Sequence, residues 1–270
     1  MKKIIALMLA FALLFCFAGC GEKDDKKSEK DAKTVVVGYT IYKPMNYEED
    51  GKLVGFDTEI AEAVFKEMGY KVVFKLIDWD QKYTELNSGT INCIWNGFTA
   101  NTADDDGVAR ADKVDFSYNY MGNKQVVVAK EAFVKDIADV NSFSGKVGAV
   151  ENSSAGDTYL TESLKGAIKK GVTSQLDAMK ELSMGAVDFV VVDEQLAKAY
   201  VGKGDYSGLA ISDKVYSDAE YYAIGFKKGS DLTAKVNSAL EKLAANGTIT
   251  ELAEKYGVTN TAIIDFADQK

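Results

Sequence analysis

Arg110 is the only arginine in a sequence of 270 residues whose other positive charges are lysines. The planar guanidinium fork matches a carboxylate, so a chain that otherwise uses lysine is expected to place its one arginine where that fork matters. Thr99 lies on the preceding predicted strand-end loop and could hold the same carboxylate through its hydroxyl. The alternative is a surface arginine that pairs with an acid at 104–106, in the polar segment 101–109 that we expect to be exposed.

A second polar group, Asn152, Ser153 and Ser154, follows the apolar segment 147–150 and precedes a predicted helix. Its backbone N–H groups and two hydroxyls would meet at a helix N-terminus, which favours anions. Capping of that helix by serine alone is the simpler alternative.

Asp193 ends the apolar run 189–192, and a buried acid there needs a cationic partner or a role as a helix cap. Capping of the predicted helix 194–200 is therefore the alternative to a binding role. Taken together, an arginine, a threonine and a helix N-terminus for a carboxylate, with an aspartate for an ammonium, predict a site for a zwitterion such as a free α-amino acid.

The composition argues against several other classes of function. A formal charge of −9 is unfavourable for nucleic acid, and the absence of histidine removes the commonest general base and metal ligand. Three cysteines without a CxxC spacing offer no zinc or iron–sulfur site. Cys93 is expected to be a buried apolar residue and not a nucleophile. We expect no catalytic residue, no metal and no cofactor.

The N-terminus predicts export. Lys2 and Lys3 precede a short apolar run, and Gly19 and Cys20 close it in a way that is typical of a lipoprotein signal. We expect cleavage of residues 1–19 and lipidation of Cys20, with an ordinary secretory signal as the alternative. Residues 20–33 are expected to form a disordered charged tether.

From Thr34 onward, β-branched runs alternate with amphipathic segments, which predicts βαβ units and a parallel sheet. The strands are expected at 35–39, 72–76, 93–96, 126–129, 147–150, 189–192 and 222–226. The helices are expected at 58–68, 81–88, 157–164, 174–184, 194–200, 232–245 and 249–256. Ser230 or Asp231 would cap the longest helix, and Gly247 would end it.

Residues 85–97 align without gaps with residues 181–193, and both segments predict a helix end, a glycine cap and a buried strand. The match predicts two α/β lobes of similar design, unless two ordinary helix–glycine–strand units match by chance. Ligands of open α/β sheets bind outside the carboxyl ends of strands, so the site is expected after Gly97 and near Asp193.

The chain also resembles a known family through several motifs, which are Pro44-Met45-Asn46-Tyr47, Gly51-Lys52-Leu53-Val54-Gly55-Phe56-Asp57, Ile94-Trp95-Asn96-Gly97-Phe98-Thr99, Asp115-Phe116-Ser117, Gly145-Lys146-Val147-Gly148, Val191-Val192-Asp193 and Asn246-Gly247-Thr248. They are similar to motifs of the extracytoplasmic solute-binding proteins of polar amino acid ABC transporters. The resemblance implies an α/β fold of the two-lobed periplasmic-binding-protein (Venus flytrap, type II) class with two hinge strands. One lobe would hold residues 34–124 plus 220–270, and the other residues 125–219.

Carried over residue by residue, the resemblance implies a ring-stacking aromatic at Tyr42, a backbone acceptor for the ammonium at Gly97 and a hydroxyl at Thr99. It implies the carboxylate-binding arginine at Arg110, the hydroxyls of the second lobe at Ser153 and Ser154, and the acid for the ammonium at Asp193. The loop before Arg110 is longer than is usual in the family. Asn152 replaces the usual glycine, a change that a left-handed turn tolerates.

Candidate pocket walls are the nearby large side chains, each of which could instead belong to the core: Tyr39, Met45, Tyr47, Trp79 and Phe98. The first strand has no acid at Tyr39-Thr40-Ile41, which disfavours a basic ligand, so we expect a polar neutral amino acid or cystine. The resemblance implies delivery of this ligand to an ABC transporter permease by a monomer that meets the outer face of the cytoplasmic membrane only through its lipid.

Two other functions are weighed against this one. A cyclohexadienyl-dehydratase-like enzyme on the same fold would need a general acid in the cleft, for which Glu151 or Glu220 is available. A ligand-sensing lipoprotein would report to a separate membrane receptor.

Overall fold

The computed structural model describes residues 33–269. The predicted signal 1–19, the lipidation residue Cys20 and the tether up to residue 32 lie outside the described residues. Within the described part, no helix combines the length and the apolar character needed to span a bilayer.

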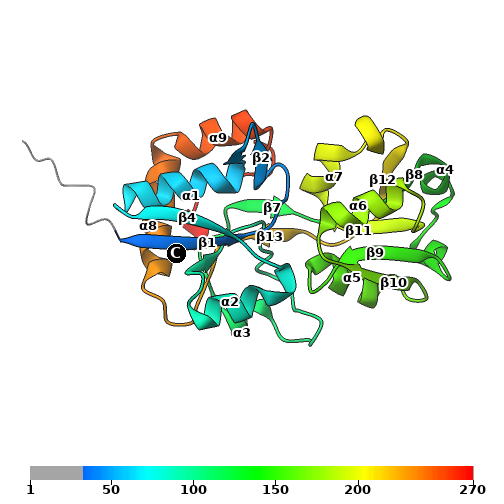
Figure 1. Ribbon diagram of the computed structural model, residues 1–270, viewed down its shortest axis with the longest axis horizontal. Helices are drawn as coiled ribbons and strands as arrows, with labels where there is room; N and C mark the ends of the chain where they lie inside the picture. The colour runs from blue at the N-terminus through cyan, green and yellow to red at the C-terminus, as the bar shows by residue number, and fades with distance from the viewer. Residues whose placement is uncertain (1–32, 270) are drawn as a thin grey trace, which may run out of the picture. The chain divides into compact units, whose positions relative to one another are not determined.

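The described chain forms two five-stranded sheets, one in each of two lobes (Figure 1). The strand order of the first sheet is β4 (Lys71–Leu76), β1 (Thr34–Tyr39), β5 (Cys93–Ile94), β14 (Gly225–Phe226) and β6 (Asp115–Phe116). The order of the second is β10 (Ile168–Val172), β9 (Val147–Glu151), β11 (Phe189–Asp193), β8 (Gln125–Lys130) and β12 (Leu209–Tyr216). Two short strands, β7 (Met121–Asn123) and β13 (Glu220–Tyr222), pair antiparallel where the chain passes from the first sheet to the second and back.

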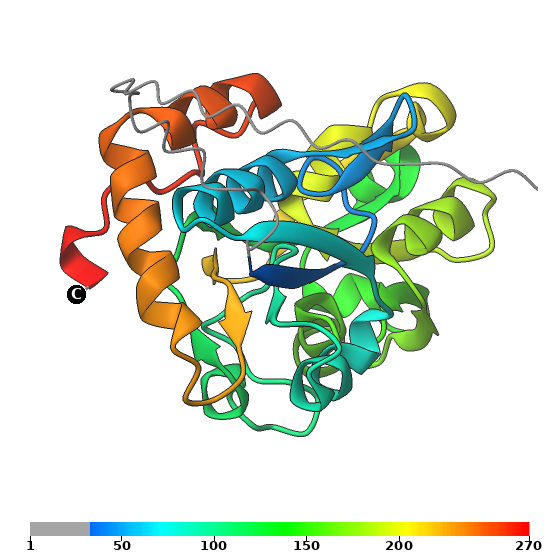
Figure 2. The same cartoon turned by 60° about the vertical axis from the view of Figure 1, so that its left-hand side comes forward.

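Helices cover both faces of each sheet. In the first lobe, α1 (Phe56–Glu67) lies on one face with α8 (Leu232–Ala245) and α9 (Thr248–Tyr256), and α2 (Lys82–Ser88) lies on the other (Figures 1 and 2). The remaining elements of this lobe are β2 (Tyr47–Glu49), β3 (Lys52–Val54), α3 (Arg110–Lys113) and the 3-10 turns Trp79–Gln81 and Ala267–Gln269. The second lobe has α4 (Glu131–Asp136), α5 (Ala155–Ser163), α6 (Gln175–Ser183), α7 (Glu194–Tyr200) and the 3-10 turns Val140–Phe143 and Gly204–Tyr206.

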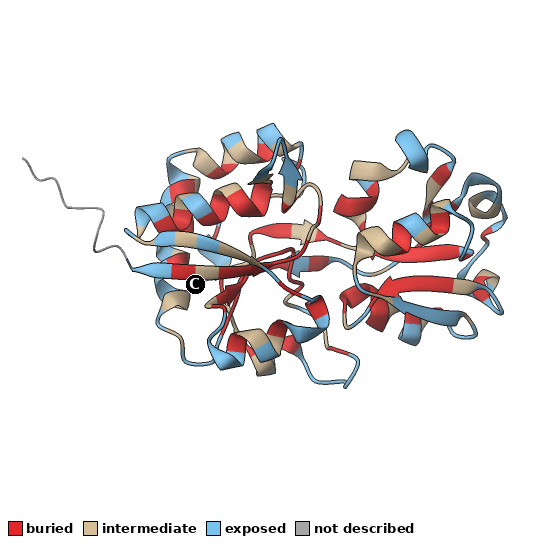
Figure 3. Cartoon of the chain, in the orientation of Figure 1, coloured by how far each residue is buried: buried red, intermediate tan, exposed pale blue. Residues whose placement is uncertain are grey.

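Strand residues alternate between two hydrophobic clusters because successive side chains point to opposite faces of a sheet. Val35 and Val37 of β1 pack in the cluster with α1, and Val36 packs against the cluster on the opposite face. Both faces are covered, so the central strands are continuous apolar runs, and β9 and β11 are buried for most of their length (Figure 3).

The expected helices and six of the seven expected strands are present, with each end within two residues of its expected position. Gly89 and Gly185 both adopt positive φ between a helix and a buried strand, as the internal match predicts. The expected strand 222–226 is wrong, because residues 223 and 224 separate β13 from β14. The sheets are mixed and not parallel, since β8 and β14 run antiparallel to their neighbours.

Close packing in the second lobe depends on Gly148 of β9. A Cβ atom at this position would lie 2.2 Å from Cζ of Phe189 in β11. The Phe189 ring in turn packs 4.7 Å, centroid to centroid, from the ring of Phe143. A methyl group at Gly148 therefore has no space unless the aromatic cluster moves.

We predict that Gly148→Ala lowers the free energy of unfolding by about 1–3 kcal/mol, the usual cost of overpacking a core. Gly208→Ala is the matched control, because no atom lies within 4 Å of its Cβ position. Urea denaturation monitored by circular dichroism measures both changes. Equal stability of the two variants would contradict the packing described here.

Candidate functional site

A small cavity lies where strand ends of the two lobes meet. Its lining residues are Trp79, Asn96, Gly97, Thr99, Arg110, Glu151, Ser154, Ala155, Gln175 and Asp193. Glu151 and Asp193 are the last residues of β9 and β11, so the cavity lies at the carboxyl ends of strands, where ligands of open α/β sheets bind. The cavity measures about 10 Å³, which is room for about one water molecule. An amino acid can therefore enter only when the lining residues move apart.

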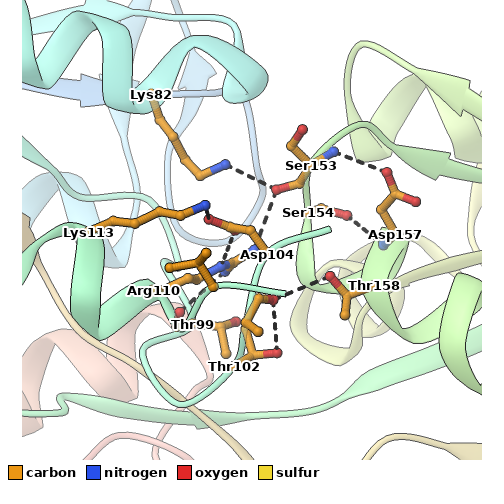
Figure 4. A network of polar contacts seen from close by, with 12 residues as sticks. Lys82, Thr99, Thr102, Asp104, Arg110, Lys113, Ser153, Ser154, Asp157 and Thr158 are labelled. Carbon is orange, nitrogen blue, oxygen red and sulfur yellow. Dashed lines mark hydrogen bonds and ion pairs between the residues drawn. The ribbon is translucent and has the colours of Figure 1, made fainter. Parts of the chain in front are cut away.

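The Arg110 side chain is buried at this cavity, with 1% of its surface exposed. Nε donates to Oδ1 of Asp104 over 2.8 Å, and Nη1 donates to the carbonyl oxygen of Thr99 over 3.2 Å. Nη2 donates to the carbonyl oxygen of Ser153 in the second lobe over 3.4 Å (Figure 4). The guanidinium carbon lies 5.2 Å from the centroid of the Phe98 ring. The guanidinium is thus held on several sides while it lines the cavity.

Asp104 corrects the expectation of an exposed acidic loop, since its side chain is buried while Asp105 and Asp106 are exposed. Its carboxylate also accepts hydrogen bonds from Lys113 Nζ over 2.8 Å and from the Tyr83 hydroxyl over 2.6 Å. Burial alone would raise the pKa of Asp104, but the Arg110 charge and these hydrogen bonds lower it to about 2. Arg110 does pair with an acid of its loop, but the pair is inside the protein.

The second lobe presents the start of α5 to the cavity. The Ser154 hydroxyl accepts from the backbone N–H of Asp157 over 3.1 Å, so this serine does cap the helix. Ser153 donates its own N–H to the Asp157 carboxylate and turns its carbonyl oxygen toward the first lobe (Figure 4). Ser153, and not Asn152, adopts the left-handed conformation, with a φ of 57°. The expected left-handed turn is therefore one residue later than the sequence suggested.

Asp193 has neither the cationic partner nor the helix-capping hydrogen bond expected from the sequence. It stands at the N-cap position of α7, but its side chain makes no capping hydrogen bond. Its carboxylate accepts from the side-chain amides of Asn123, Gln125 and Gln175, at 2.7, 2.6 and 2.5 Å. Burial raises the pKa of Asp193 against the effect of these donors. Amide dipoles solvate this carboxylate without neutralising its charge.

The backbone of Gly97 is fixed from within the first lobe. Its N–H donates to Oδ2 of Asp57 over 2.8 Å, and the Tyr120 hydroxyl donates to the same oxygen over 2.9 Å. A Cβ at Gly97 would lie 2.7 Å from Cε1 of Tyr42, and its φ is 59°. Only glycine fits this combination of backbone conformation and close ring packing.

The expected site residues thus divide into three groups. Gly97, Thr99, Arg110, Ser154, Asp193 and the wall residue Trp79 line the cavity together. Tyr42 and Ser153 lie beside it, with the Tyr42 hydroxyl 2.7 Å from the Tyr222 hydroxyl. The other expected wall residues are packed elsewhere: Tyr39 against Phe74, Met45 in the core, Tyr47 against Tyr256, and Phe98 beneath Arg110.

The sequence reasoning missed Asn96 and Gln175, which line the cavity, and Lys82, which contacts residues beside it. Asn96 lies in the motif that ends at Thr99, but nothing in the sequence distinguishes Gln175 from other helical polar residues. The Lys82 ammonium donates to the carbonyl oxygens of Trp79 over 3.3 Å and Ser153 over 3.0 Å. Burial and the nearby Arg110 charge lower its pKa to about 7.

We predict that Asp104→Asn destabilises the protein by about 3–5 kcal/mol, because the variant leaves the buried Arg110 charge without its partner. Asp105→Asn, a change of the adjacent exposed acid, should alter stability by less than about 0.5 kcal/mol. Chemical denaturation of the two variants measures the difference. Similar small effects would mean that Asp104 does not neutralise Arg110.

The buried acids also predict a pH dependence of stability. Burial raises the pKa of Asp57 and Glu220 to about 7 and that of Glu151 to about 8. Raised folded-state pKa values stabilise the protein at low pH, and this stability is lost as pH rises through them. The free energy of unfolding should therefore fall from pH 5 to pH 7, by up to about 1.4 kcal/mol per pH unit for each group.

Lys82 offsets this slope only as pH approaches 7, where its lowered pKa lets the folded state lose a proton that the unfolded state keeps. Glu220→Gln removes one titrating group and should make the slope shallower. Denaturation curves at several pH values test the prediction, and stability that is constant or rises over this interval would disprove it.

Comparison with known sequences shows the family to which this chain belongs. The model for bacterial extracellular solute-binding proteins, family 3, matches residues 35–259. An arginine-binding extracellular protein of Bacillus subtilis is 27% identical, with 95% of this chain and 98% of the relative covered. A probable amino-acid-binding protein of the same organism is 32% identical, with 95% of each chain covered.

Solved structures give the same result. An ancestral arginine-binding protein bound to arginine is 33% identical with a TM-score of 0.75, over 83% of this chain and 97% of that one. A substrate-binding protein of an ABC uptake transporter from Streptococcus pneumoniae with bound histidine is 30% identical with a TM-score of 0.75, over 85% and 94%. These likenesses confirm the two-lobed periplasmic-binding-protein fold. The chain belongs to the family 3 bacterial extracellular solute-binding proteins.

Proposed function

We propose that this protein binds a free amino acid between its lobes and delivers it to the permease of an ABC transporter. The observation that supports this most strongly is the lining of one cavity by a buried guanidinium, Arg110, and a buried carboxylate, Asp193. A free amino acid carries the two complementary charges, an ammonium and a carboxylate, on the same α-carbon. Relatives named for binding arginine and cystine agree with this class of ligand.

Binding would couple to closure of the lobes. The first lobe provides Gly97, Thr99 and Arg110, whereas the second provides Ser154 and Asp193. Only a closed arrangement contacts both ends of the amino acid, so the ligand favours that arrangement. We assign residues 34–124 and 220–270 to one lobe and residues 125–219 to the other, with Tyr42 and Ser153 supporting the site from behind its lining.

The place of action would be outside the cytoplasm, as for the family. We propose that Cys20 is lipidated after removal of residues 1–19 and that residues 20–33 tether a monomer to the outer face of the cytoplasmic membrane. A tethered binding protein of this kind presents its ligand close to the permease. Neither a cofactor nor a metal enters this function.

One observation bears on an enzymatic alternative. Burial and the charge of Asp193 raise the pKa of Glu151, a lining residue, to about 8, so this group could donate a proton near neutral pH. An ancestral amino-acid-binding protein described as a precursor of cyclohexadienyl dehydratase is 26% identical, with a TM-score of 0.72, over 83% of this chain and 95% of that one. Turnover of prephenate or arogenate would establish the enzyme, whereas we expect none.

The proposed function is tested by a thermal-shift panel on protein from residue 21 onward, unfolded and refolded to strip bound ligand. The panel holds the common amino acids and cystine, with several sugars as negative controls. A ligand at a hundredfold excess over its dissociation constant should stabilise the protein by about 2.7 kcal/mol. A response to sugars alone, or to nothing, would exclude amino acid binding.

We predict that Arg110→Ala weakens amino acid binding by about 2–5 kcal/mol, because one partner of a buried charge pair is removed. Arg110→Lys keeps a positive charge beside Asp104 but loses the fork, so it should bind weakly while remaining folded. Lys228→Ala, a change of an exposed lysine outside the cavity, is the control. Unchanged affinity in both Arg110 variants, measured by calorimetry, would remove this residue from the site.

A further inference from the structure

The cavity carries more carboxyl groups than the α-ammonium of an amino acid can neutralise. Asp193 and Glu151 line it, with 5% and 4% of their surfaces exposed. Glu220 lies behind them, where its Oε2 accepts from Thr99 Oγ1 over 3.2 Å and from Gln125 Nε2 over 2.9 Å. Among residues 33–269, none of these three carboxylates takes part in an ion pair.

The cations near the cavity are already engaged with other groups. Arg110 forms its ion pair with Asp104. The Lys82 ammonium donates to two backbone carbonyl oxygens, one in each lobe, and lies over the Trp79 ring at 5.0 Å. Lys113 bridges Asp104 and the exposed Asp106. Carbonyl oxygens do not neutralise Lys82, so its charge remains, and among residues 33–269 no cation forms an ion pair with the Glu151 carboxyl.

A zwitterion with a neutral side chain would not change this balance. Its carboxylate would be bound by Arg110 and its ammonium by Asp193, and the Glu151 carboxyl would remain buried without a counter-charge. Burial without a partner keeps this carboxyl protonated near neutral pH, because its ionisation there is strongly unfavourable. A ligand with a second positive charge removes that penalty, and a ligand with a neutral side chain does not.

We propose that Glu151 is a specificity-determining residue that selects an amino acid whose side chain ends in an ammonium or guanidinium group. The inference rests on the proposed function and narrows its ligand class. It replaces the neutral ligand or cystine expected from the first strand, because the selecting acid comes from β9 in the second lobe and not from β1. Trp79 lines the same cavity and offers a flat apolar surface to the methylene stem of such a side chain.

The protonation of Glu151 agrees with this assignment. Its carboxyl faces Asp193, Gln175 and Lys82, and burial together with the Asp193 charge raises its pKa to about 8. A cationic group bound beside it would favour the ionised form, so binding should release a proton at neutral pH. A ligand with a neutral side chain would not cause this release.

The test is isothermal titration calorimetry of the wild-type protein with arginine against citrulline and with lysine against norleucine. Each pair has similar size and differs in the side-chain charge. We expect the cationic member of at least one pair to bind at least about tenfold more tightly. Repeating the titration in buffers of different ionisation enthalpy should show proton release with the cationic ligand only.

Glu151→Gln should reduce the affinity for the cationic ligand at least about tenfold and leave the affinity for its neutral partner within about threefold. Glu162→Gln changes an exposed acid of α5 and should leave both affinities unchanged. If Glu151→Gln does not fold, the wild-type selectivity and proton release still decide the question.

Equal or tighter binding of the neutral members, with no effect of Glu151→Gln on selectivity, would overturn this inference and leave the proposed function intact. Binding of no amino acid at all would overturn both. The two failures are distinguishable in the same series of titrations.

Discussion

The buried ion pair between Arg110 and Asp104 holds the guanidinium in place at the cavity. Two opposite charges inside a protein must satisfy each other, since removal of either leaves a charge without water or a partner. Asp104 occupies Nε of Arg110, and the two terminal nitrogens donate to backbone carbonyl oxygens, one of them in the second lobe. The loop that precedes Arg110 must therefore fold inward at Asp104, although its neighbours at 105 and 106 remain in solvent.

The rest of the site depends on the hydrogen bonds that hold the residues at the strand ends of each lobe. In the first lobe, Asp57 at the start of α1 holds the N–H of Gly97 and thereby the loop that carries Thr99. In the second lobe, the amides of Asn123, Gln125 and Gln175 hold the Asp193 carboxylate without cancelling its charge. The site is thus built from two halves, and within residues 33–269 the chain passes between their sheets through the segments of β7 and β13 and the residues beside them.

Much of this arrangement could be predicted from local patterns. The β-branched runs and glycine-capped helices specify the central strands and long helices, and the rarity of arginine drew attention to Arg110, which lines the cavity. The edge strand β10 was missed because its sequence, Ile-Lys-Lys-Gly-Val, is mostly exposed and has no apolar run. The burial of Asp104 could not be predicted, because three consecutive aspartates look alike in sequence and only the fold separates them.

Hydrogen-bond partners that lie far apart in the sequence were the second feature that could not be predicted. The amides around Asp193 come from positions 18 to 70 residues away in sequence, and no periodicity connects them to it. Buried polar groups are satisfied by whichever donors the fold brings near, so a partner of Asp193 could be expected but its identity could not. The same holds for Lys82, whose partners are backbone oxygens that leave no trace in side-chain patterns.

The most direct test of the account is a crystal structure of the protein with its amino acid bound. We expect a ligand between the lobes, with its carboxylate within about 3 Å of Arg110 nitrogens and its ammonium within about 3 Å of the Asp193 carboxylate. A ligand bound outside this cavity, or bound there with Arg110 still turned only to protein groups, would contradict it.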